Sequence, residues 1–173
     1  TGATVTISSG LTTGDLLGFT TQNGISGSFS SGVLTLTGSA TVAQYQTALR
    51  SVTYSSSSDN PTATSASRTI SWQVNDGSGS NNLSTAVTST VNITAVNDNP
   101  VATAGGTLAY TENGSAAAID TSISLTDADS ANLTGATVTI SSGLTTGDLL
   151  GFTTQNGISG SFSSGVLTLT GSA

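Results

Sequence analysis

The sequence predicts an all-β fold built from tandem repeat units, and three observations lead to this prediction. Residues 1–40 return without a change as residues 134–173, so the repeat has a period of 134 − 1 = 133 residues. Short runs alternate apolar and hydroxyl-bearing side chains, which is the period-2 pattern of half-buried strands. Gly- and Ser-rich turns separate these runs, and turns at this spacing are typical of a β-sandwich.

The repeat also sets the expected domain organisation. A unit of 133 residues is large enough to bury one core, and a domain that returns unchanged indicates a tandem array. We therefore expect the chain to be a window of about 1.3 units from something longer. In this interpretation residues 1–96 form a unit that lacks its first strands, residues 97–100 form a linker, and residues 101–173 start the next unit.

The expected strands follow one another with inward-facing apolar side chains, and turns such as residues 30–32 (SSG) and 75–80 (NDGSGS) separate them. The next unit opens with a further set of apolar alternations before the repeat resumes at Thr134. The apolar positions are Val5 and Ile7; Leu17 and Phe19; Leu34 and Leu36; Val52 and Tyr54; Ile70, Trp72 and Val74; Val87, Val91 and Ile93; then Leu108 and Tyr110, and Ile123 and Leu125.

One segment breaks the strand pattern. In residues 41–50, Val42, Tyr45 and Leu49 fall on one face of a helix. The first and fourth residues of the segment, a Thr and a Gln, match a capping box. The sequence therefore predicts one short helix that crosses an end of the sandwich.

The residue types that are absent exclude most enzymatic chemistry. The chain has no Cys, His or Lys, so it has no disulfide, no imidazole base, no Ser–His or Cys–His nucleophile and no Lys-based isopeptide bond. A pair of carboxylates for glycoside hydrolysis is possible in principle, but the best-clustered acids do not lie in a recognisable cleft. We expect no enzyme activity.

The charge balance limits the partners. Only Arg50 and Arg68 are cationic, against nine carboxylates, which gives a net charge of −7. Such a chain repels nucleic acid and anionic membrane surfaces. No stretch is long and apolar enough to cross a bilayer, so we expect no membrane insertion.

A boundary between units is predicted at Asn97-Asp98-Asn99-Pro100. Pro100 has no N–H to donate to a strand ladder, and the Asn and Asp residues favour turns. Strand pairing should therefore stop here.

The acidic residues near this boundary indicate a cation site. Asp127 and Asp129 share the parity of the apolar residues before them, which places both carboxylates on one side where a strand leaves the core. Together with Asp98 they would converge at the pole where two units meet, and three carboxylates without a cation would repel. Ca²⁺ takes six to eight oxygen ligands, and Asn97 and Asn99 supply neutral oxygens of the right kind.

Four motifs carry a resemblance to a known family. Residues 95–100 (AVNDNP) resemble the cadherin linker motif with its first Asp replaced by Ala95, and residues 127–129 (DAD) resemble the cadherin Asp-x-Asp motif. Residues 111–113 (TEN) resemble the Glu-bearing motif of a first strand, and residues 74–77 (VNDG) resemble Ala-x-Asp-x-Gly. The unit as a whole is similar to the cadherin-like tandem repeats of giant secreted bacterial adhesins of the repeats-in-toxin type. This resemblance implies immunoglobulin- or cadherin-like Greek-key β-sandwich units in tandem.

The resemblance also assigns ligands to particular junctions. Glu112 would serve the junction after its own unit, and Asp76 the junction before its unit. Asp59, in a degenerate motif, could reach the junction at Asp98. The missing first Asp of the linker, and a missing second Glu, imply one or two ions per junction rather than three. The implied ligands at the boundary are Asn97, Asp98, Asn99, Asp127 and Asp129, with Asn132 able to add a carbonyl.

Several of these residues also have a simpler structural interpretation. Asp127 and Asp129 could be solvated turn residues. Trp72 lies on an inward face and fits the core better than a glycan-stacking platform. We also interpret three other acids as turn or cap residues, namely Asp15, its copy Asp148, and Asp120.

Three functional hypotheses follow. The leading one is a structural extender repeat of an extracellular or cell-surface bacterial adhesin or matrix protein, which Ca²⁺ rigidifies at inter-repeat junctions and whose partners are neighbouring repeats. The alternative is a protomer of a self-assembling surface filament, in which identical protomers donate strands like residues 101–133 to one another. A carbohydrate- or ice-binding module is the third, although no exposed aromatic cluster or regular Thr ladder supports it.

Overall fold

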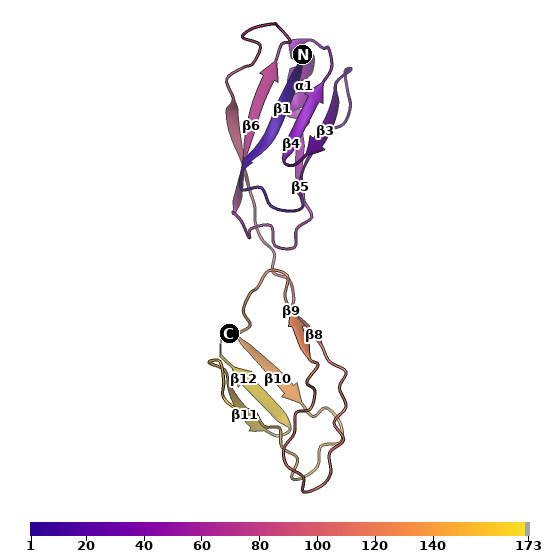
Figure 1. Cartoon of the computed structure of the whole chain (residues 1–173), viewed down its shortest axis with the longest axis vertical. Helices are drawn as coiled ribbons and strands as arrows, with labels where there is room; N and C mark the ends of the chain where they lie inside the picture. Colours follow the sequence, from indigo (N-terminus) through magenta and orange to yellow (C-terminus); the bar gives the residue numbers. More distant parts are fainter. Residues whose placement is uncertain (172–173) are drawn as a thin grey trace. The chain divides into compact units, whose positions relative to one another are not determined.

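A computed structural model describes residues 1–171, which form antiparallel β-sheets and one short helix (Figure 1). The chain divides into two compact units, Thr1–Asn97 (unit 1) and Asp98–Ala173 (unit 2). The division falls inside the predicted linker, residues 97–100. Across residues 1–171, no helix has the length and apolar character needed to span a membrane.

Unit 1 contains two sheets, as the alternating pattern predicts. The larger has the order β3-β4-β1-β6-β7 and the smaller pairs β2 with β5, in both cases antiparallel. All six apolar runs predicted for this unit overlap strands, although Phe19, Val52 and Ile93 each lie one residue outside. The bounds are β1 Gly2–Ser9, β2 Asp15–Gly18, β3 Ser26–Ser30, β4 Val33–Thr37, β5 Thr53–Ser56, β6 Ser67–Asn75 and β7 Val87–Asn92.

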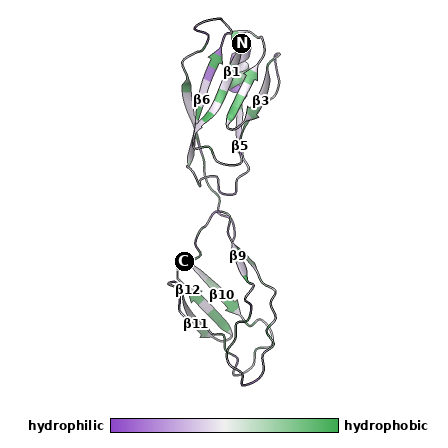
Figure 2. Ribbon diagram, viewed as in Figure 1, coloured by the Kyte–Doolittle hydropathy of each residue, from purple (hydrophilic) through white to green (hydrophobic). Residues whose placement is uncertain are grey.

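The core of unit 1 lies on the inward-facing positions of these strands. Along β1, Ala3, Val5 and Ile7 are buried while the residues between them are not fully buried. They pack with buried residues of β2, β4, β6 and the helix in one hydrophobic cluster. Figure 2 shows the hydrophobic positions spaced along the strands. The period-2 pattern thus correctly predicts the buried faces of β1, β2 and β4, but Val74 and Val87, which it also predicts to face inward, are 39% and 62% exposed.

The hairpin between β3 and β4 turns through two residues, Ser31 and Gly32. Both have positive φ, at 50° and 82°. Two successive positive φ values are typical of a type I′ turn, whose twist matches that of the flanking strands. The turn is at the predicted position, but β3 itself is not predicted, because its sequence SGSFS has one apolar residue and no alternation.

Helix α1 spans Val42–Arg50 and confirms the predicted helix. The Thr41 hydroxyl accepts a hydrogen bond from the backbone N–H of Gln44 at 3.3 Å, and the Thr41 N–H donates to Gln44 Oε1 at 2.9 Å. This reciprocal pair is the predicted capping box. The buried residues of the helix are Tyr45 and Ala48, whereas Val42 remains 87% exposed.

Unit 2 has a three-stranded sheet of order β10-β12-β11 and a separate pair, β8 with β9. The prediction that strand structure begins at Leu108 and Tyr110 is wrong, because residues 104–123 contain no strand. β8 and β9 pair only with each other among the described residues, and the segment between them joins neither this pair nor the β10-β12-β11 sheet. The bounds are β8 Val101–Thr103, β9 Ser124–Thr126, β10 Gly135–Thr139, β11 Ser159–Ser163 and β12 Val166–Thr170.

Candidate functional site

The acidic turn of unit 2, residues 126–132 (TDADSAN), follows directly from the end of β9. Within it, Asp127 Oδ1 accepts hydrogen bonds from the backbone N–H groups of Ser130 at 2.8 Å and Asp129 at 3.1 Å. These bonds, the one from Ser130 foremost, lower the pKa of Asp127. Asp127 therefore shapes the turn and stays ionised, while its second oxygen accepts neither of these bonds.

Asp129 links the acidic turn to the linker. Its Oδ2 accepts a hydrogen bond from the backbone N–H of Asp98 at 3.4 Å. Its Oδ1 is buried and has no hydrogen-bond partner. A buried carboxylate oxygen without a partner is unfavourable, and a bound cation is one way to satisfy it. The donor chemistry of this position therefore fits Ca²⁺, a hard cation that binds oxygen.

The structure brings Asp98, Asp127 and Asp129 into one region of unit 2, but not into a closed coordination shell. Within residues 1–171 no group of three or more Asp, Glu, His or Cys side chains is placed to hold a metal ion. Asn99 is exposed next to Asp98, and Asn132 is exposed at the end of the acidic turn. Asn97 is the last residue of unit 1.

Three other predicted ligands have separate surroundings. Glu112 is exposed in a turn that the Gly114 N–H to Thr111 C=O bond closes. Asp59 is exposed in the loop between β5 and β6 of unit 1. Asp76 follows β6, and its Oδ1 accepts the backbone N–H of Ser78 at 2.9 Å, which is the main cause of its lowered pKa.

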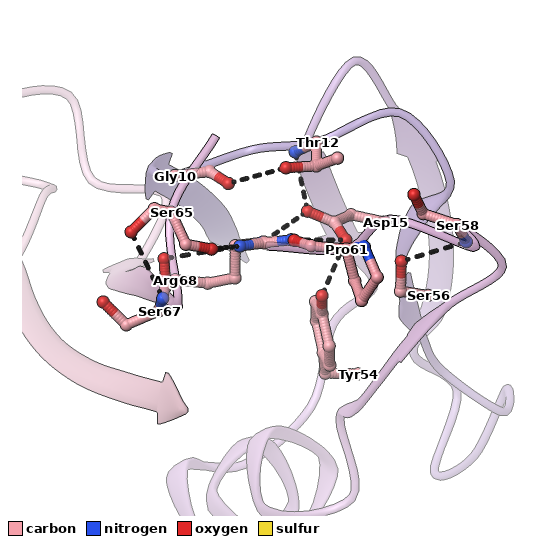
Figure 3. Close-up of polar contacts among 10 residues, drawn as sticks. All are labelled: Gly10, Thr12, Asp15, Tyr54, Ser56, Ser58, Pro61, Ser65, Ser67 and Arg68. Atoms are coloured by element: carbon pink, nitrogen blue, oxygen red, sulfur yellow. Dashed lines mark hydrogen bonds and ion pairs between the residues drawn. The ribbon is translucent and has the colours of Figure 1, made fainter. Parts of the chain in front are cut away.

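The most strongly built polar site in unit 1 is a buried ion pair that we did not predict (Figure 3). Arg68 on β6 is fully buried, and its Nε donates to Asp15 Oδ2 at 2.6 Å. The two outer nitrogens of Arg68 donate to Asp15 Oδ1 at 3.3 Å and to the backbone carbonyls of Pro61 at 2.6 Å and Ser65 at 2.7 Å. The guanidinium is therefore held on several sides.

The carboxylate of this pair is equally well satisfied. Tyr54 OH donates to Asp15 Oδ1 at 2.6 Å, and the Thr12 N–H donates to Oδ2 at 2.8 Å. Burial alone would raise the pKa of Asp15, but the hydrogen bonds from Arg68, Tyr54 and Thr12 outweigh it and lower the pKa to about 2. Burial, and then the adjacent carboxylate, raise the pKa of Tyr54. The ion pair ties β2, β5 and β6 together.

A sequence signal for Arg68 existed. It shares the parity of Ile70 and Trp72, so it had to face inward, and an inward cation requires an anionic partner. The expected turn role of Asp15 is confirmed by the hydrogen bond that it accepts from the Thr12 N–H. Because this local role already explained Asp15, its ion pair with Arg68 was not predicted. The other two acids interpreted as turn or cap residues have that role: Asp148 Oδ2 accepts the Thr145 N–H at 2.9 Å, and Asp120 accepts the N–H groups of Gly105, Gly106 and Ser122.

No protein-family model, no curated protein and no solved structure matches this chain.

Proposed function

We propose that the chain is a structural extender repeat of an extracellular bacterial adhesin or matrix protein, and that Ca²⁺ stiffens its linker. One observation carries the proposal. Asp129 holds the N–H of Asp98 with one carboxylate oxygen, while its other oxygen is buried without a partner. A divalent cation on that oxygen would fix the linker against the acidic turn.

The proposed ligands are the carboxylates of Asp98, Asp127 and Asp129, with Asn97 and Asn99 as sources of neutral oxygen. Ca²⁺ supplies charge compensation and a coordination shell that can draw in backbone and amide oxygens. Repulsion between the three carboxylates favours open arrangements of the linker when no cation is bound. Cation binding therefore lowers the flexibility of residues 97–100.

The expected affinity fits an extracellular setting. Extracellular calcium modules bind in the range of about 10⁻⁴ to 10⁻³ M. A repeat with such sites stays stiff in calcium-rich surroundings and softens on chelation. A role without catalysis agrees with a chain that contains no Cys, His or Lys.

The finer fold assignment belongs to the same proposal. Two antiparallel sheets in unit 1 contribute to a single core, which supports a sandwich. We assign this sandwich to the immunoglobulin- and cadherin-like Greek-key class on the sequence motifs 95–100 and 127–129.

Calcium titration of the 173-residue chain tests the proposal, with the melting temperature and small-angle scattering as readouts. We expect millimolar Ca²⁺ to raise the melting temperature of unit 2 and to narrow the distribution of interunit distances. Asp129→Asn should remove both effects, and the matched control Asp148→Asn, in an exposed turn of the same unit, should keep them. Unchanged melting and scattering in the unmodified chain would contradict the proposal.

A further inference from the structure

Each copy of the 40-residue repeat carries one Asn-Gly step. The steps are Asn23-Gly24 in unit 1 and Asn156-Gly157 in unit 2. An Asn before Gly is chemically reactive, because glycine has no side chain to keep its backbone nitrogen away from the preceding amide. The local sequences are identical, so the intrinsic reactivity of the two steps is the same. Any difference between them therefore comes from the surrounding structure.

Both steps lie in exposed two-residue turns that leave the glycine nitrogen free. In unit 1 the Gln22 N–H donates to the Ile25 carbonyl at 3.1 Å, and the Ile25 N–H donates back at 2.8 Å. Asn23 and Gly24 between them are exposed, and the Gly24 N–H donates no hydrogen bond within residues 1–171. The turn of unit 2, residues 155–158, is closed by the same two bonds at the same distances.

The geometry of the closed turn opposes the reaction. The Asn has a φ of 51° in unit 1 and 50° in unit 2, and the Gly has 73° and 76°, which are the positive values of a type I′ turn. An imide ring forms only when the Asn side chain folds onto the next backbone nitrogen, and for this the chain must leave the paired conformation. The reaction rate therefore follows the fraction of time for which each turn is open.

Contacts with α1 hold the turn of unit 1 closed. Gln22 Nε2 donates to Ser51 Oγ at 2.7 Å, and Ser51 is the C-cap residue of α1. Ile25 is fully buried in the core cluster that includes Tyr45 of α1. The Tyr45 OH also donates at 2.7 Å to the carbonyl of Gly38, a residue that packs directly against the turn.

The turn of unit 2 has fewer such restraints. Ile158, the counterpart of Ile25, is only partly buried. Gln155, the counterpart of Gln22, is exposed, and the bond that Gln22 makes to the helix cap has no equivalent there among the described residues. Within the described part of unit 2 there is no helix. This turn should therefore open more often than its copy in unit 1.

We infer that the Asn-Gly turn of the repeat is a site of spontaneous deamidation, and that α1 protects it. In this chain Asn156 is the reactive site and Asn23 the protected one. The glycine nitrogen gives up its proton and bonds to Asn Cγ, while the side-chain NH₂ takes up a proton and leaves as ammonia. One water then opens the imide ring at either carbonyl, which gives aspartate or isoaspartate. Each event adds one negative charge to a chain of net charge −7.

The isoaspartate product disrupts the turn. Its main chain runs through the former side chain and is one carbon longer, so the two residues no longer close a type I′ turn. In unit 2 the pairing of β11, which begins at Ser159 directly after the turn, should therefore weaken. This inference does not depend on calcium, and its tests are done in EDTA so that it can fail separately from the proposed function.

The first experiment incubates the 173-residue chain in mildly alkaline buffer with EDTA. Trypsin cuts only after Arg50 and Arg68, so the two Asn residues lie in different peptides. Fragment ions separate Asn156 from Asn113, which lies in the same peptide. Mass spectrometry of samples taken over days then gives the deamidation rate at each position. We expect Asn156 to react about tenfold faster than Asn23. Equal rates, a faster reaction at Asn23, or no reaction at Asn156 would overturn the inference.

The same incubation in denaturing urea is the control for the fold. With both turns unfolded, the rates at Asn23 and Asn156 should become equal, because the sequences around them are identical. A difference that persists in urea would show that contacts with α1 are not its cause, and the inference would fail.

A matched pair of variants tests the role of α1. Ser51→Ala removes the hydroxyl that holds Gln22, whereas Thr47→Ala removes a hydroxyl of the same helix that bonds the helix backbone instead. We expect Ser51→Ala to raise the deamidation rate at Asn23 about fivefold, and Thr47→Ala to leave it unchanged. The rate at Asn156 should be the same in both variants and in the unmodified chain. Equal rates at Asn23 in the two variants would contradict protection by α1.

Discussion

The two copies of the 40-residue repeat have the same sequence but different structures. In unit 1 the first strand, β1, has eight residues, whereas its counterpart β10 in unit 2 has five. Val5 is fully buried in β1, and the equivalent Val138 is 39% exposed in β10. The difference arises because β1 also pairs with β6, while β10 pairs only with β12 among the described residues.

Features that depend on neighbouring residues are the same in both copies. The hairpin turn has φ values of 50° and 82° at Ser31 and Gly32, and of 52° and 81° at Ser164 and Gly165. Asp15 and Asp148 accept the same local backbone bond, but only Asp15 has a buried arginine partner. Turns are therefore encoded locally, whereas strand length, burial and the ion pair require residues 41–97.

The largest expected effect comes from removing the cation of the buried pair. Arg68→Met leaves the Asp15 carboxylate buried without its partner, which should destabilise unit 1 by about 3–5 kcal/mol. Urea unfolding followed by Trp72 fluorescence measures this loss. The matched control, Arg50→Met, removes the other cation and should change stability by less than about 1 kcal/mol. Similar losses of stability in the two variants would show that the ion pair is not a major source of stability in unit 1.

The stability of unit 1 should also depend on pH. The folded-state pKa of Asp15 is about 2, below the ordinary value of 3.8. The ionised carboxylate therefore stabilises unit 1 above pH 3.8, and this contribution, about 2 kcal/mol, is lost as the pH falls towards 2. Denaturant unfolding at a series of pH values, read at Trp72, measures the loss. A flat profile across this window would contradict the ionised pair.

Identical substitutions at equivalent core positions give a direct internal comparison. Val5→Ala removes fully buried methyl groups and should lower the free energy of unfolding by about 2 kcal/mol. Val138→Ala should lower it by less than about 1 kcal/mol. Amide hydrogen exchange in β1 and β10 reports each value separately. Equal losses would mean that the second copy is as well packed as the first.

The hairpin turns should give the smallest difference between copies. Gly32→Ala and Gly165→Ala each place a Cβ at a positive φ and within 3 Å of a leucine side chain. We expect each substitution to lower the stability of its hairpin by about 1–2 kcal/mol, because the backbone strain that it introduces is local. Amide hydrogen exchange of β4 and β12 measures the loss of stability in each hairpin. Clearly different losses in the two hairpins would show that the turn depends on distant contacts.

The limits of sequence-based prediction follow the same division between local and long-range effects. Alternation and capping signals identify the strands around Val5 and Ile70 and the helix beginning at Val42, because these patterns are read within a few residues. β3 is not predicted because it consists mainly of Ser and Gly. The Asp15–Arg68 pair is not predicted because its members are far apart in sequence and Asp15 already has a local turn role. Residues 104–123 form no strand, because an apolar run becomes a strand only where its backbone pairs with a neighbouring strand.

At the candidate cation site, the sequence predicts that Asp127 and Asp129 follow a strand and lie near Asp98. In the structure both follow β9, and the N–H of Asp98 donates to Asp129. The assignments of Glu112 and Asp76 to other junctions, and of Asp59 to the junction at Asp98, come from motif resemblance and remain predictions.

We propose that a calcium ion joins the linker to the acidic turn, and amide chemical shifts recorded during a Ca²⁺ titration report on this contact at each residue. We expect saturable shifts at residues 98 and 127–130 at about 10⁻⁴ to 10⁻³ M Ca²⁺, with none at the exposed turn of Asp148. The absence of shifts at residues 98 and 127–130, or shifts of equal size around Asp148, would contradict the claim.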